Sequence, residues 1–319
     1  MRSRSTTSES RPVALAVATV IALAGAAVPV VTGCGATAGP PAVSSTGTVS
    51  PATVPTGPAM VPTAPAAVAG NRPAGSPPPA DPAGPPRTVP GATRPGTRPP
   101  VVDHGPRTGN LVALTFDADM TEAMRYDLRS GAVRSYANLA VIELLEREQV
   151  PATFFLTGMW VEQYPELTRR LAGNPRFELA NHTYGHTAFT ADCYGLPQLP
   201  PTAMTADVAR TFDVIEPYGG RQTRYFRFPG LCHDGAALAA LAPIGLTVVD
   251  GDVISGDPFA TAWEPIVDAV LSGVRPGSVV VLHVTEANAA LTDEALPHIL
   301  VGLRDRGLTP AALSEVLAE

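Results

Sequence analysis

The sequence predicts an α/β fold in which six to seven strand–helix units build a parallel barrel sheet. Short runs rich in β-branched and aromatic residues alternate with longer segments whose apolar residues recur at helical spacing. Alternation of this kind places successive strands parallel in one sheet. The alternating part covers residues 109–319, and its 211 residues suffice for one hydrophobic core. So many units in that length favour a barrel over a doubly wound open sheet.

The N-terminal segment, residues 1–34, has the order of an export signal. Arg2, Arg4 and Arg11 precede an apolar run, which small residues close at Cys34. The ending Val-Thr-Gly-Cys resembles the lipobox of bacterial lipoproteins, which implies that Cys34 is lipidated and anchors the chain to the outer face of the cell membrane. A plain signal peptide or an uncleaved membrane anchor stays open, because the run exceeds the roughly 15 residues of a usual secretory core. Each alternative exports the rest of the chain.

Residues 35–108 are predicted to be a disordered linker. This stretch holds 19 of the 35 prolines, two acids and no Trp, Phe or Tyr. Such a composition cannot bury enough apolar surface to offset the entropy of the chain. Because proline-rich sequence favours extended conformations, we expect the linker to act as a semi-rigid spacer.

The charge of the remaining domain, residues 109–319, argues against nucleic acid as a partner. The whole chain has a net charge of −7, whereas this part has 14 arginines and 26 acids, a net charge of −12. Cys193 and Cys232 are the cysteines left after Cys34, an even pair in an exported domain. We expect a disulfide between them, with two free buried thiols as the alternative.

The individual elements follow the alternation in order. The expected strands are residues 111–116, 152–156, 177–180, 225–228, 246–249 and 278–282. The expected helices are residues 135–149, 160–172, 203–215, 235–241, 263–271 and 293–306. In the first of these helices, apolar residues stand at positions 139, 142, 144 and 145, which is the spacing of one helical face.

Polar and ionisable residues collect where the expected strands end. In parallel barrels the chemistry gathers at the C-terminal ends of the strands. The residues found there are Asp117, Asp119, His182, His186, Arg227, Asp250, Asp252, Asp257 and His283. Asp250 and Asp252 are interpreted as turn residues at a strand end, and the others predict one site.

The two histidines of this set suggest a metal site. His182 and His186 are four residues apart, which on a helical turn places both imidazoles on one side. A catalytic site of the zinc type needs a third ligand, and a carboxylate from another strand end is the usual one. Asp117 and Asp119 point to the same side of an extended chain. One carboxylate can therefore bind the metal while the other acts on water.

Five segments of the chain resemble a known family. They are Leu-Thr-Phe-Asp-Ala-Asp (114–119), His-Thr-Tyr-Gly-His-Thr (182–187), Arg-Phe-Pro-Gly (227–230), Asp-Val-Ile-Ser-Gly-Asp (252–257) and Val-Leu-His (281–283). In order and spacing they are similar to the five motifs of the polysaccharide deacetylases, carbohydrate esterase family 4, also called the NodB-homology domain. The resemblance covers essentially all of residues 109–319, and residues 296–317 resemble the family's final helices.

The resemblance implies a metal-dependent hydrolase with a distorted (β/α) barrel that removes N-acetyl or O-acetyl groups from sugar polymers. It assigns Asp117 as general base, Asp119, His182 and His186 as metal ligands, Arg227 as the group that orients the base, Asp257 as the group that tunes the catalytic histidine, and His283 as general acid. The family has adjacent aspartates where Ala118 separates this pair, so which aspartate is base and which is ligand stays open. The implied metal is a divalent ion, zinc first, with cobalt or another divalent ion as the alternative.

The chemistry of acetyl hydrolysis is consistent with these roles. A divalent metal activates water and polarises the acetyl carbonyl. The oxyanion needs the metal and a backbone N–H, which we place near Gly230. The leaving sugar nitrogen needs a proton, and His283 can donate it if a nearby carboxylate keeps its pKa high.

The expected function is removal of N-acetyl groups from cell-wall glycan by a monomer. Peptidoglycan is the preferred substrate, because a lipid anchor and a long linker place the domain in the wall. An O-acetyl polysaccharide esterase is one alternative, and a non-catalytic module that binds wall glycan is another. Pro258 stands where an aromatic residue commonly follows the fourth motif, and Val281 replaces the leucine of the last motif. The preferred glycan therefore does not follow from the resemblance.

Overall fold

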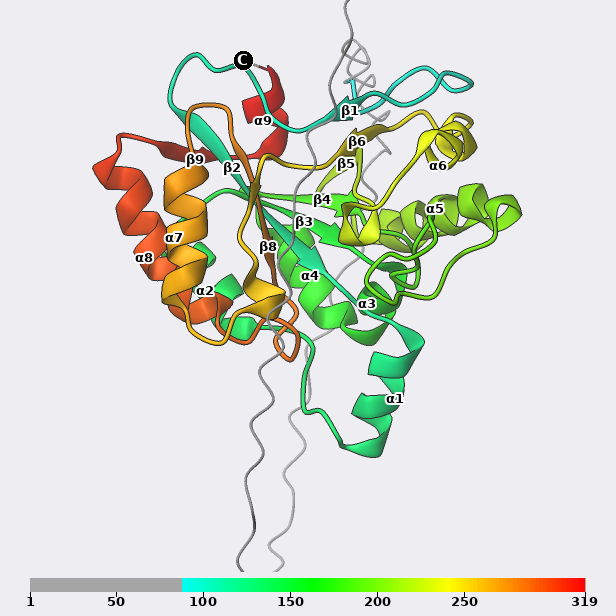
Figure 1. Ribbon diagram of the computed structural model, residues 1–319, viewed down its shortest axis with the longest axis horizontal. Coiled ribbons are helices and arrows are strands. Elements are labelled where there is room, and N and C mark those ends of the chain that lie inside the picture. The colour runs from blue at the N-terminus through cyan, green and yellow to red at the C-terminus, as the bar shows by residue number, and fades with distance from the viewer. Residues whose placement is uncertain (1–87, 319) are drawn as a thin grey trace, which may run out of the picture. The chain divides into compact units, whose positions relative to one another are not determined.

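The computed structural model describes residues 88–318 (Figure 1). The predicted export signal and the part of the predicted linker up to residue 87 lie outside the described residues. None of the helices between residues 88 and 318 combines the length and the hydrophobicity that a membrane span requires.

Within residues 88–318, nine strands form one sheet, and every strand pairing in it is parallel. The strands are β1 Val101–Val102, β2 Leu111–Ala118, β3 Ala152–Leu156, β4 Phe177–Asn181, β5 Arg221–Phe226, β6 Thr247–Val249, β7 Val253–Ile254, β8 Val279–His283 and β9 Thr309–Ala311.

Helices follow most of these strands. The α-helices are α1 Glu122–Ser130, α2 Leu139–Arg147, α3 Gly158–Gln163, α4 Pro165–Gly173, α5 Pro201–Ile215, α6 Gly235–Leu241, α7 Glu264–Gly273, α8 Thr292–Asp305 and α9 Leu313–Ala318. Three short 3₁₀ helices are η1 Glu216–Tyr218, η2 Pro229–Leu231 and η3 Asp257–Phe259.

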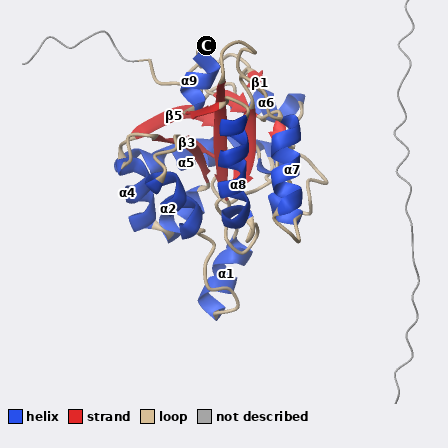
Figure 2. Ribbon diagram, turned by 90° about the vertical axis from the view of Figure 1, so that its left-hand side faces the viewer, coloured by secondary structure: helices blue, strands red, loops and turns tan. Residues whose placement is uncertain are grey.

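The predicted fold class, an α/β fold with a parallel, barrel-like sheet, is confirmed. The strand order is β1-β6-β5-β4-β3-β2-β8-β7, with β9 beside β2. Among the described residues, the end strands β1 and β7 are not paired with each other, so the curled sheet forms an open half-barrel. In Figure 2, α8 lies in front of the red strands, with α2 and α4 to its left and α7 to its right, so these helices cover the outer side of the sheet.

The central strands are buried on both faces, which explains their near-continuous apolar sequences. In β2, Leu114 and Phe116 point outward and join the largest core cluster with residues of α2 and α8. Ala113, one position along, points to the inner face, where Leu313 and Val316 of α9 pack. Because β9 pairs with the first residues of β2, α9 closes the inner face at the N-terminal ends of the strands. The C-terminal ends of the strands remain open for a site.

The predicted end of the linker at residue 108 is wrong, because residues 88–108 belong to the folded domain. Val101 and Val102 pair with the edge strand β6. Proline carbonyls on this segment accept hydrogen bonds from β5 and β6, with Pro90 O 2.7 Å from the Arg224 nitrogen. Proline lacks a backbone donor but keeps its acceptor. A proline-rich segment can therefore cover the N–H groups of a sheet edge, which its composition alone did not indicate.

The predicted helix over residues 160–172 is wrong as one helix, because it is two. Pro165 begins α4, and Tyr164 before it has φ −124° and ψ 59°, outside the helical region. A residue before proline is pushed out of the α-helical conformation, so the chain turns here. Helix α1, capped by Thr121 and ended by Gly131 with φ 77°, was not predicted, and neither were the short strands β1, β7 and β9.

Candidate active site

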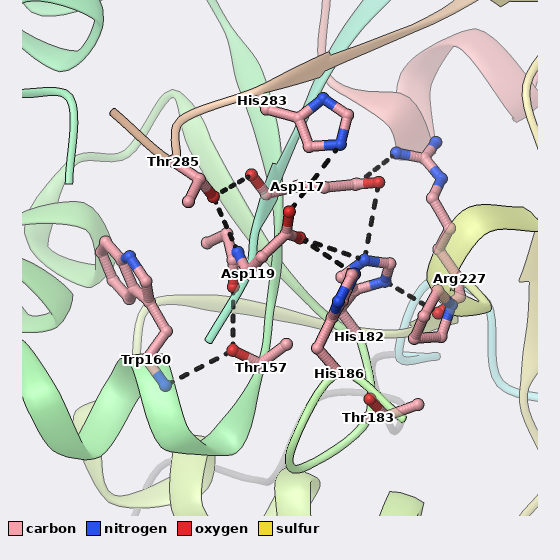
Figure 3. Close-up of polar contacts among 12 residues, drawn as sticks. Asp117, Asp119, Thr157, Trp160, His182, Thr183, His186, Arg227, His283 and Thr285 are labelled. Atoms are coloured by element: carbon pink, nitrogen blue, oxygen red, sulfur yellow. Dashed lines mark hydrogen bonds and ion pairs between the residues drawn. The ribbon is translucent and has the colours of Figure 1, made fainter. Parts of the chain in front are cut away.

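One pocket of about 500 Å³ opens at the C-terminal ends of β2, β4 and β8. Its lining brings together residues from all five of the motif segments. They are Asp117, Asp119, His182, His186, Tyr194, Leu196, Gly230, Leu231, Ile254, Gly256, Asp257, Pro258, Phe259, Val281, His283, Ala287 and Asn288. Figure 3 shows the ionisable side chains of this pocket pointing toward one another.

Asp117 and Asp119 stand on the same side of the chain at the end of β2. Both are buried, with 4% exposed, and both line the pocket, while Ala118 between them points into the core. The Ala118 carbonyl accepts a hydrogen bond from the Thr157 hydroxyl at 2.9 Å. The backbone N–H of Asp119 donates to the Thr285 hydroxyl at 2.9 Å (Figure 3). These bonds fix the peptide between the two carboxylates, so an intervening alanine does not separate them from one site.

Arg227 holds Asp117 in one orientation. Its Nη1 donates to Asp117 Oδ1 at 2.6 Å, and its Nε donates to the Val249 carbonyl at 3.1 Å. The guanidinium is fully buried and lies 4.0 Å from the centre of the Phe155 ring. A buried carboxylate paired with a buried arginine has little freedom to rotate. Its second oxygen, Oδ2, lies 3.6 Å from His182 Nε2 and faces the pocket.

Asp119, His182 and His186 form the cluster that can hold a metal ion. One ligand atom from each lies within 4.8 Å of the others. Asp119 Oδ1 is 3.5 Å from His182 Nε2 and 3.3 Å from His186 Nε2. His182 Nδ1 lies 2.9 Å from the Arg227 carbonyl. A proton on Nδ1 then leaves the Nε2 lone pair free for a metal, as is usual for histidine ligands.

The charges in this cluster suit a cation. Burial lowers the pKa of His186 to about 4, so its imidazole is neutral and has a free lone pair. Burial by itself would raise the pKa of Asp119, but the neighbouring histidines, His186 first, outweigh it and hold that pKa well below its usual range. The carboxylate is therefore ionised at neutral pH.

The environment of Asp119 Oδ1 shows whether the residues of the cluster fit a metal ion. It is buried and has no hydrogen-bond partner within residues 88–318, although a buried carboxylate oxygen without a partner is costly. A cation between this oxygen and the two imidazoles would satisfy it. One carboxylate and two histidines form a donor set typical of zinc and of similar divalent ions. The cluster therefore fits a divalent metal.

The two histidines do not lie on a helical turn, and that expectation is wrong. Both belong to the loop that follows β4, in which Thr183 has φ 69° and His186 has φ 53°. The N–H groups at the start of α3 bind this loop, with Gly158 N donating to Thr183 O at 3.1 Å. Asp207 on α5 accepts from the Tyr184 N–H at 2.8 Å. The loop thus brings the imidazoles together by a left-handed turn, with ring centres 5.0 Å apart.

His283 and Asp257 form a second ionisable pair in the pocket, with His283 next to Asp117 in the pairing of β8 with β2. His283 Nδ1 lies 2.8 Å from Asp257 Oδ1, and the His283 backbone N–H donates to Oδ2 at 2.8 Å. The hydroxyls of Thr292 and Ser255 also donate to this carboxylate, each at 2.7 Å. Burial works to lower the pKa of His283, but Asp257 and the pocket carboxylates raise it to about 10. A protonated imidazole with Nε2 toward the pocket can donate a proton there.

Gly230 also lines the pocket. Its φ is 61°, and a Cβ at this position would lie 2.8 Å from Cys193 Sγ and 2.8 Å from the Tyr194 ring. Glycine is required here both by the backbone conformation and by the close approach. Cys193 and Cys232 are joined by a disulfide, the pairing expected from the sequence. It links the loop after β4 to the segment after β5.

Asp250 and Asp252 lie outside the pocket lining, in agreement with their interpretation as turn residues. Asp252 accepts hydrogen bonds from Arg107, from the Ser278 hydroxyl and from the Val279 N–H. Asp250 Oδ2 lies 2.9 Å from His233 Nε2.

Sequence reasoning missed the apolar residues of the pocket wall, Tyr194, Leu196, Ile254 and Phe259. Phe259 follows Pro258, one position after the place where the family's aromatic residue was sought. Tyr194 follows Cys193, so the disulfide was the one signal that pointed to its loop.

Comparisons with known proteins point to one family. The family model for polysaccharide deacetylases matches residues 104–249. A chitooligosaccharide deacetylase of Sinorhizobium fredii is 31% identical over 185 residues, which cover 55% of this chain and 83% of the relative.

Three solved structures share the fold. A family 4 acetyl xylan esterase from Clostridium thermocellum in complex with a cobalt ion is 27% identical, with a TM-score of 0.52 over 65% of this chain and 90% of that one. A peptidoglycan N-acetylglucosamine deacetylase is 21% identical, with a TM-score of 0.57 over 68% and 92%. A pseudoenzyme of carbohydrate esterase family 4 from Bacillus anthracis is 20% identical, with a TM-score of 0.55 over 69% of each chain. The last two show the fold alone.

The sequence relative, the family match and the five motif segments that meet at one pocket lead to the same assignment. This chain belongs to the polysaccharide deacetylases of carbohydrate esterase family 4, a family of hydrolases that act on acetyl groups.

Proposed function

We propose that this protein is a metal-dependent deacetylase that hydrolyses the N-acetyl groups of cell-wall glycan, with peptidoglycan as the preferred substrate. The observation that carries the proposal is the arrangement of three groups around one pocket. The Asp119, His182 and His186 cluster lies next to Asp117, which Arg227 holds, and next to His283, which Asp257 holds.

The ligands of the metal would be Asp119, His182 and His186. A divalent ion in this cluster, zinc first or else cobalt, supplies a Lewis acid that polarises the acetyl carbonyl and acidifies water. The 27% identical esterase structure contains cobalt, which supports a divalent ion without selecting one.

Asp117 is the general base in this proposal. It takes a proton from the attacking water with the oxygen that faces the pocket, while Arg227 holds the other oxygen at 2.6 Å. The orphaned oxygen of Asp119, which faces both imidazoles, favours Asp119 as the ligand rather than the base. Gly230 lines the pocket, and in this proposal its backbone N–H donates to the oxyanion.

His283 is the general acid. The C–N bond breaks only when the sugar nitrogen receives a proton, because an amine anion is a very poor leaving group. Asp257 keeps His283 protonated and fixes its Nδ1, so the proton available to the substrate is on Nε2. Asp117 and His283 are neighbours on the paired strands β2 and β8, and together they supply the separate proton acceptor and proton donor that the hydrolysis requires.

Two arguments support wall glycan as the substrate. The N-terminal sequence resembles an export signal with a lipobox, and a proline-rich stretch follows it. The 31% identical relative is a chitooligosaccharide deacetylase, and its substrate shares N-acetylglucosamine with peptidoglycan. An O-acetyl polysaccharide esterase is the second candidate, and the identity to an acetyl xylan esterase favours it. A non-catalytic module is disfavoured because base, acid and ligands are all present.

The test is acetate release by the full chain from peptidoglycan, chitohexaose and acetylated xylan. Each is measured after chelation and again after addition of zinc or cobalt, with His182→Ala alongside. Release from peptidoglycan that returns with metal and is absent in the variant is the expected result. Release from acetylated xylan alone would select the esterase, and no release from any glycan by the folded protein would select the non-catalytic module.

We further propose that lipidated Cys34 anchors the domain to the outer face of the cell membrane. The support is the Val-Thr-Gly-Cys ending of the apolar run. Cells that express the full chain and are fed radiolabelled palmitate should label the wild type, and Cys34→Ala should stay unlabelled. Equal labelling of the two proteins, or none in either, would contradict the anchor.

A further inference from the structure

We propose that the Cys193–Cys232 disulfide presents Tyr194 to the substrate, and that Tyr194 and Phe259 form an aromatic rim on which a sugar ring of the glycan packs. The inference rests on the proposed function, because it names how the same site recognises its substrate. Tyr194 and Phe259 are called the aromatic rim below.

The aromatic rim is the most exposed apolar part of the pocket. Tyr194 is 71% exposed and Phe259 is 75% exposed, and both line the pocket. With Ile254, which is 50% exposed, they account for three of the eight large exposed hydrophobic side chains between residues 88 and 318. Exposed apolar side chains that gather at one place mark a binding surface. Here that surface adjoins the ionisable groups of the site.

The two rings come from distant segments and contact each other. Tyr194 lies on the loop between β4 and α5, and Phe259 ends the 3₁₀ helix that begins with Asp257. Their ring centres are 5.9 Å apart and their planes are inclined by 32°. Since Asp257 holds His283, a sugar on the aromatic rim lies beside the general acid.

The loop holds Tyr194 in a conformation that needs support from outside. Asp192 has φ 56° and Tyr194 has φ 51°, a left-handed backbone that is unfavourable for residues with a Cβ. Among the described residues, the backbone-to-backbone hydrogen bonding of residues 190–196 stays within the loop, with Leu196 N donating to Cys193 O at 2.9 Å. The disulfide is the tie that joins this stretch to the segment after β5. Cys193 is 2% exposed, so the end of the tie next to Tyr194 is buried.

The segment that contains Cys232 packs closely against Cys193 and Tyr194. Gly230, two residues before Cys232, leaves the space that the Tyr194 ring and the Cys193 sulfur occupy. The sulfur also lies 3.4 Å from the Pro229 carbonyl oxygen. The third motif segment therefore has room, at Gly230, both for the Tyr194 ring and for the Cys193 sulfur that is bonded to Cys232.

The chemistry of the aromatic rim selects a pyranose ring. A β-linked pyranose has one face made of C–H groups, which packs on an aromatic ring, and it leaves its hydroxyl groups to solvent at the ring edge. A pocket that is apolar apart from a few convergent polar groups fixes a ligand in this way. An acetyl group on that sugar can then reach the metal cluster inside the pocket.

The test compares Tyr194→Ala, Tyr194→Phe and the double variant Cys193→Ser/Cys232→Ser in the full chain loaded with zinc. The substrate is chitohexaose, the β-1,4-linked hexamer of N-acetylglucosamine. We expect Tyr194→Ala and the cysteine-free variant each to raise KM about tenfold with kcat within about threefold, and Tyr194→Phe to restore the wild-type KM. Tyr126→Ala on α1, a tyrosine that is 64% exposed and not part of the pocket lining, is the matched control and should leave KM unchanged.

A double-mutant cycle separates presentation of Tyr194 from simple loss of stability. If the disulfide acts through Tyr194, then Tyr194→Ala adds less than about twofold to KM in the cysteine-free background. Full additivity, or a wild-type KM in the folded cysteine-free variant, would overturn the proposal. Thermal melting and metal content of each variant show whether it is folded.

Binding to the His283→Ala protein, measured by calorimetry, distinguishes failure of this proposal from failure of the proposed function. Chitohexaose binding that weakens about tenfold with Tyr194→Ala supports the aromatic rim even if no acetate is released from any glycan. Acetate release by the wild type together with unchanged binding in the Tyr194→Ala background overturns the rim and keeps the function. Absence of both binding and release overturns both.

Discussion

His283 illustrates how single residues of this site acquire their roles. Alone in the pocket wall it would be neutral, because burial disfavours its charged form. Asp257 reverses this, and the carboxylate is itself held by the hydroxyls of Thr292 and Ser255 and by a backbone N–H. Asp257 thus keeps the His283 imidazole protonated, so that it can donate a proton to the leaving group.

Asp257→Asn should shift the pH dependence of the reaction. The amide removes the largest influence that raises the pKa of His283, so the imidazole loses its proton at lower pH. The alkaline limb of the kcat profile should then move to lower pH, and kcat at pH 8 should fall about 100-fold. Ser255→Ala is the control, because it removes one hydrogen bond and keeps the charge. An alkaline limb that stays in place in Asp257→Asn would contradict the role of His283 as general acid.

At the scale of elements, helices α3 and α5 hold the loop that contains His182 and His186. The loop from β4 is held by the start of α3 and by Asp207 on α5, which accepts from the Tyr184 N–H. Tyr184 donates its hydroxyl proton to Glu162, and Arg210 lies 3.4 Å from the centre of its ring. These contacts fix a left-handed turn that the isolated sequence would not adopt.

Asp207 should make stability depend on pH. Burial raises its pKa from 3.8 to about 6, against the opposing effects of the Tyr184 N–H and Arg210. The folded protein therefore binds more protons than the unfolded chain between about pH 4 and pH 6. The contribution of Asp207 to the free energy of unfolding is largest below this window and falls as pH rises through it. The fall is at most about 3 kcal/mol, because solvent screens the partly exposed carboxyl and reduces the effect.

Asp207→Asn should remove that slope, because the amide oxygen still accepts from Tyr184 and has no proton to lose. Urea unfolding of the chelated protein from pH 4 to pH 7 measures it. The exposed Asp213 on the same helix provides the control variant Asp213→Asn, whose slope should equal that of the wild type. Parallel curves for wild type and Asp207→Asn would show that the Asp207 carboxyl does not titrate in this window.

At the scale of the whole molecule, the folded domain includes residues 88–108, which precede the first motif segment. β1 covers the edge of β6, and Arg107 reaches Asp252 at 2.6 Å. A chain that begins at residue 109 should expose this edge and melt about 10 °C or more below one that begins at residue 88, which should match the full chain. Thermal melting with size-exclusion chromatography measures both. Equal melting temperatures would mean that residues 88–108 contribute nothing to the domain.

The long parallel strands could be predicted from the sequence because both of their faces are buried, so their apolar runs are continuous. The catalytic and ligand residues stand at the ends of those strands, where a parallel sheet must bring them together. What could not be predicted depends on tertiary contacts. The two-residue strand β7 has no pattern of its own, the left-handed turn at Thr183 and His186 is stabilised by α3, and Tyr194 reaches the pocket only through the disulfide.

The central claim is that Asp119, His182 and His186 hold one metal ion without which no acetate is released. The most direct measurement is titration of the chelated full chain with zinc or cobalt, following acetate release from chitohexaose together with bound metal. We expect activity to rise linearly and stop at one equivalent per chain, and Asp119→Ala to lose both binding and activity. Full activity of the metal-free protein, or tight metal binding that persists in Asp119→Ala, would contradict the claim.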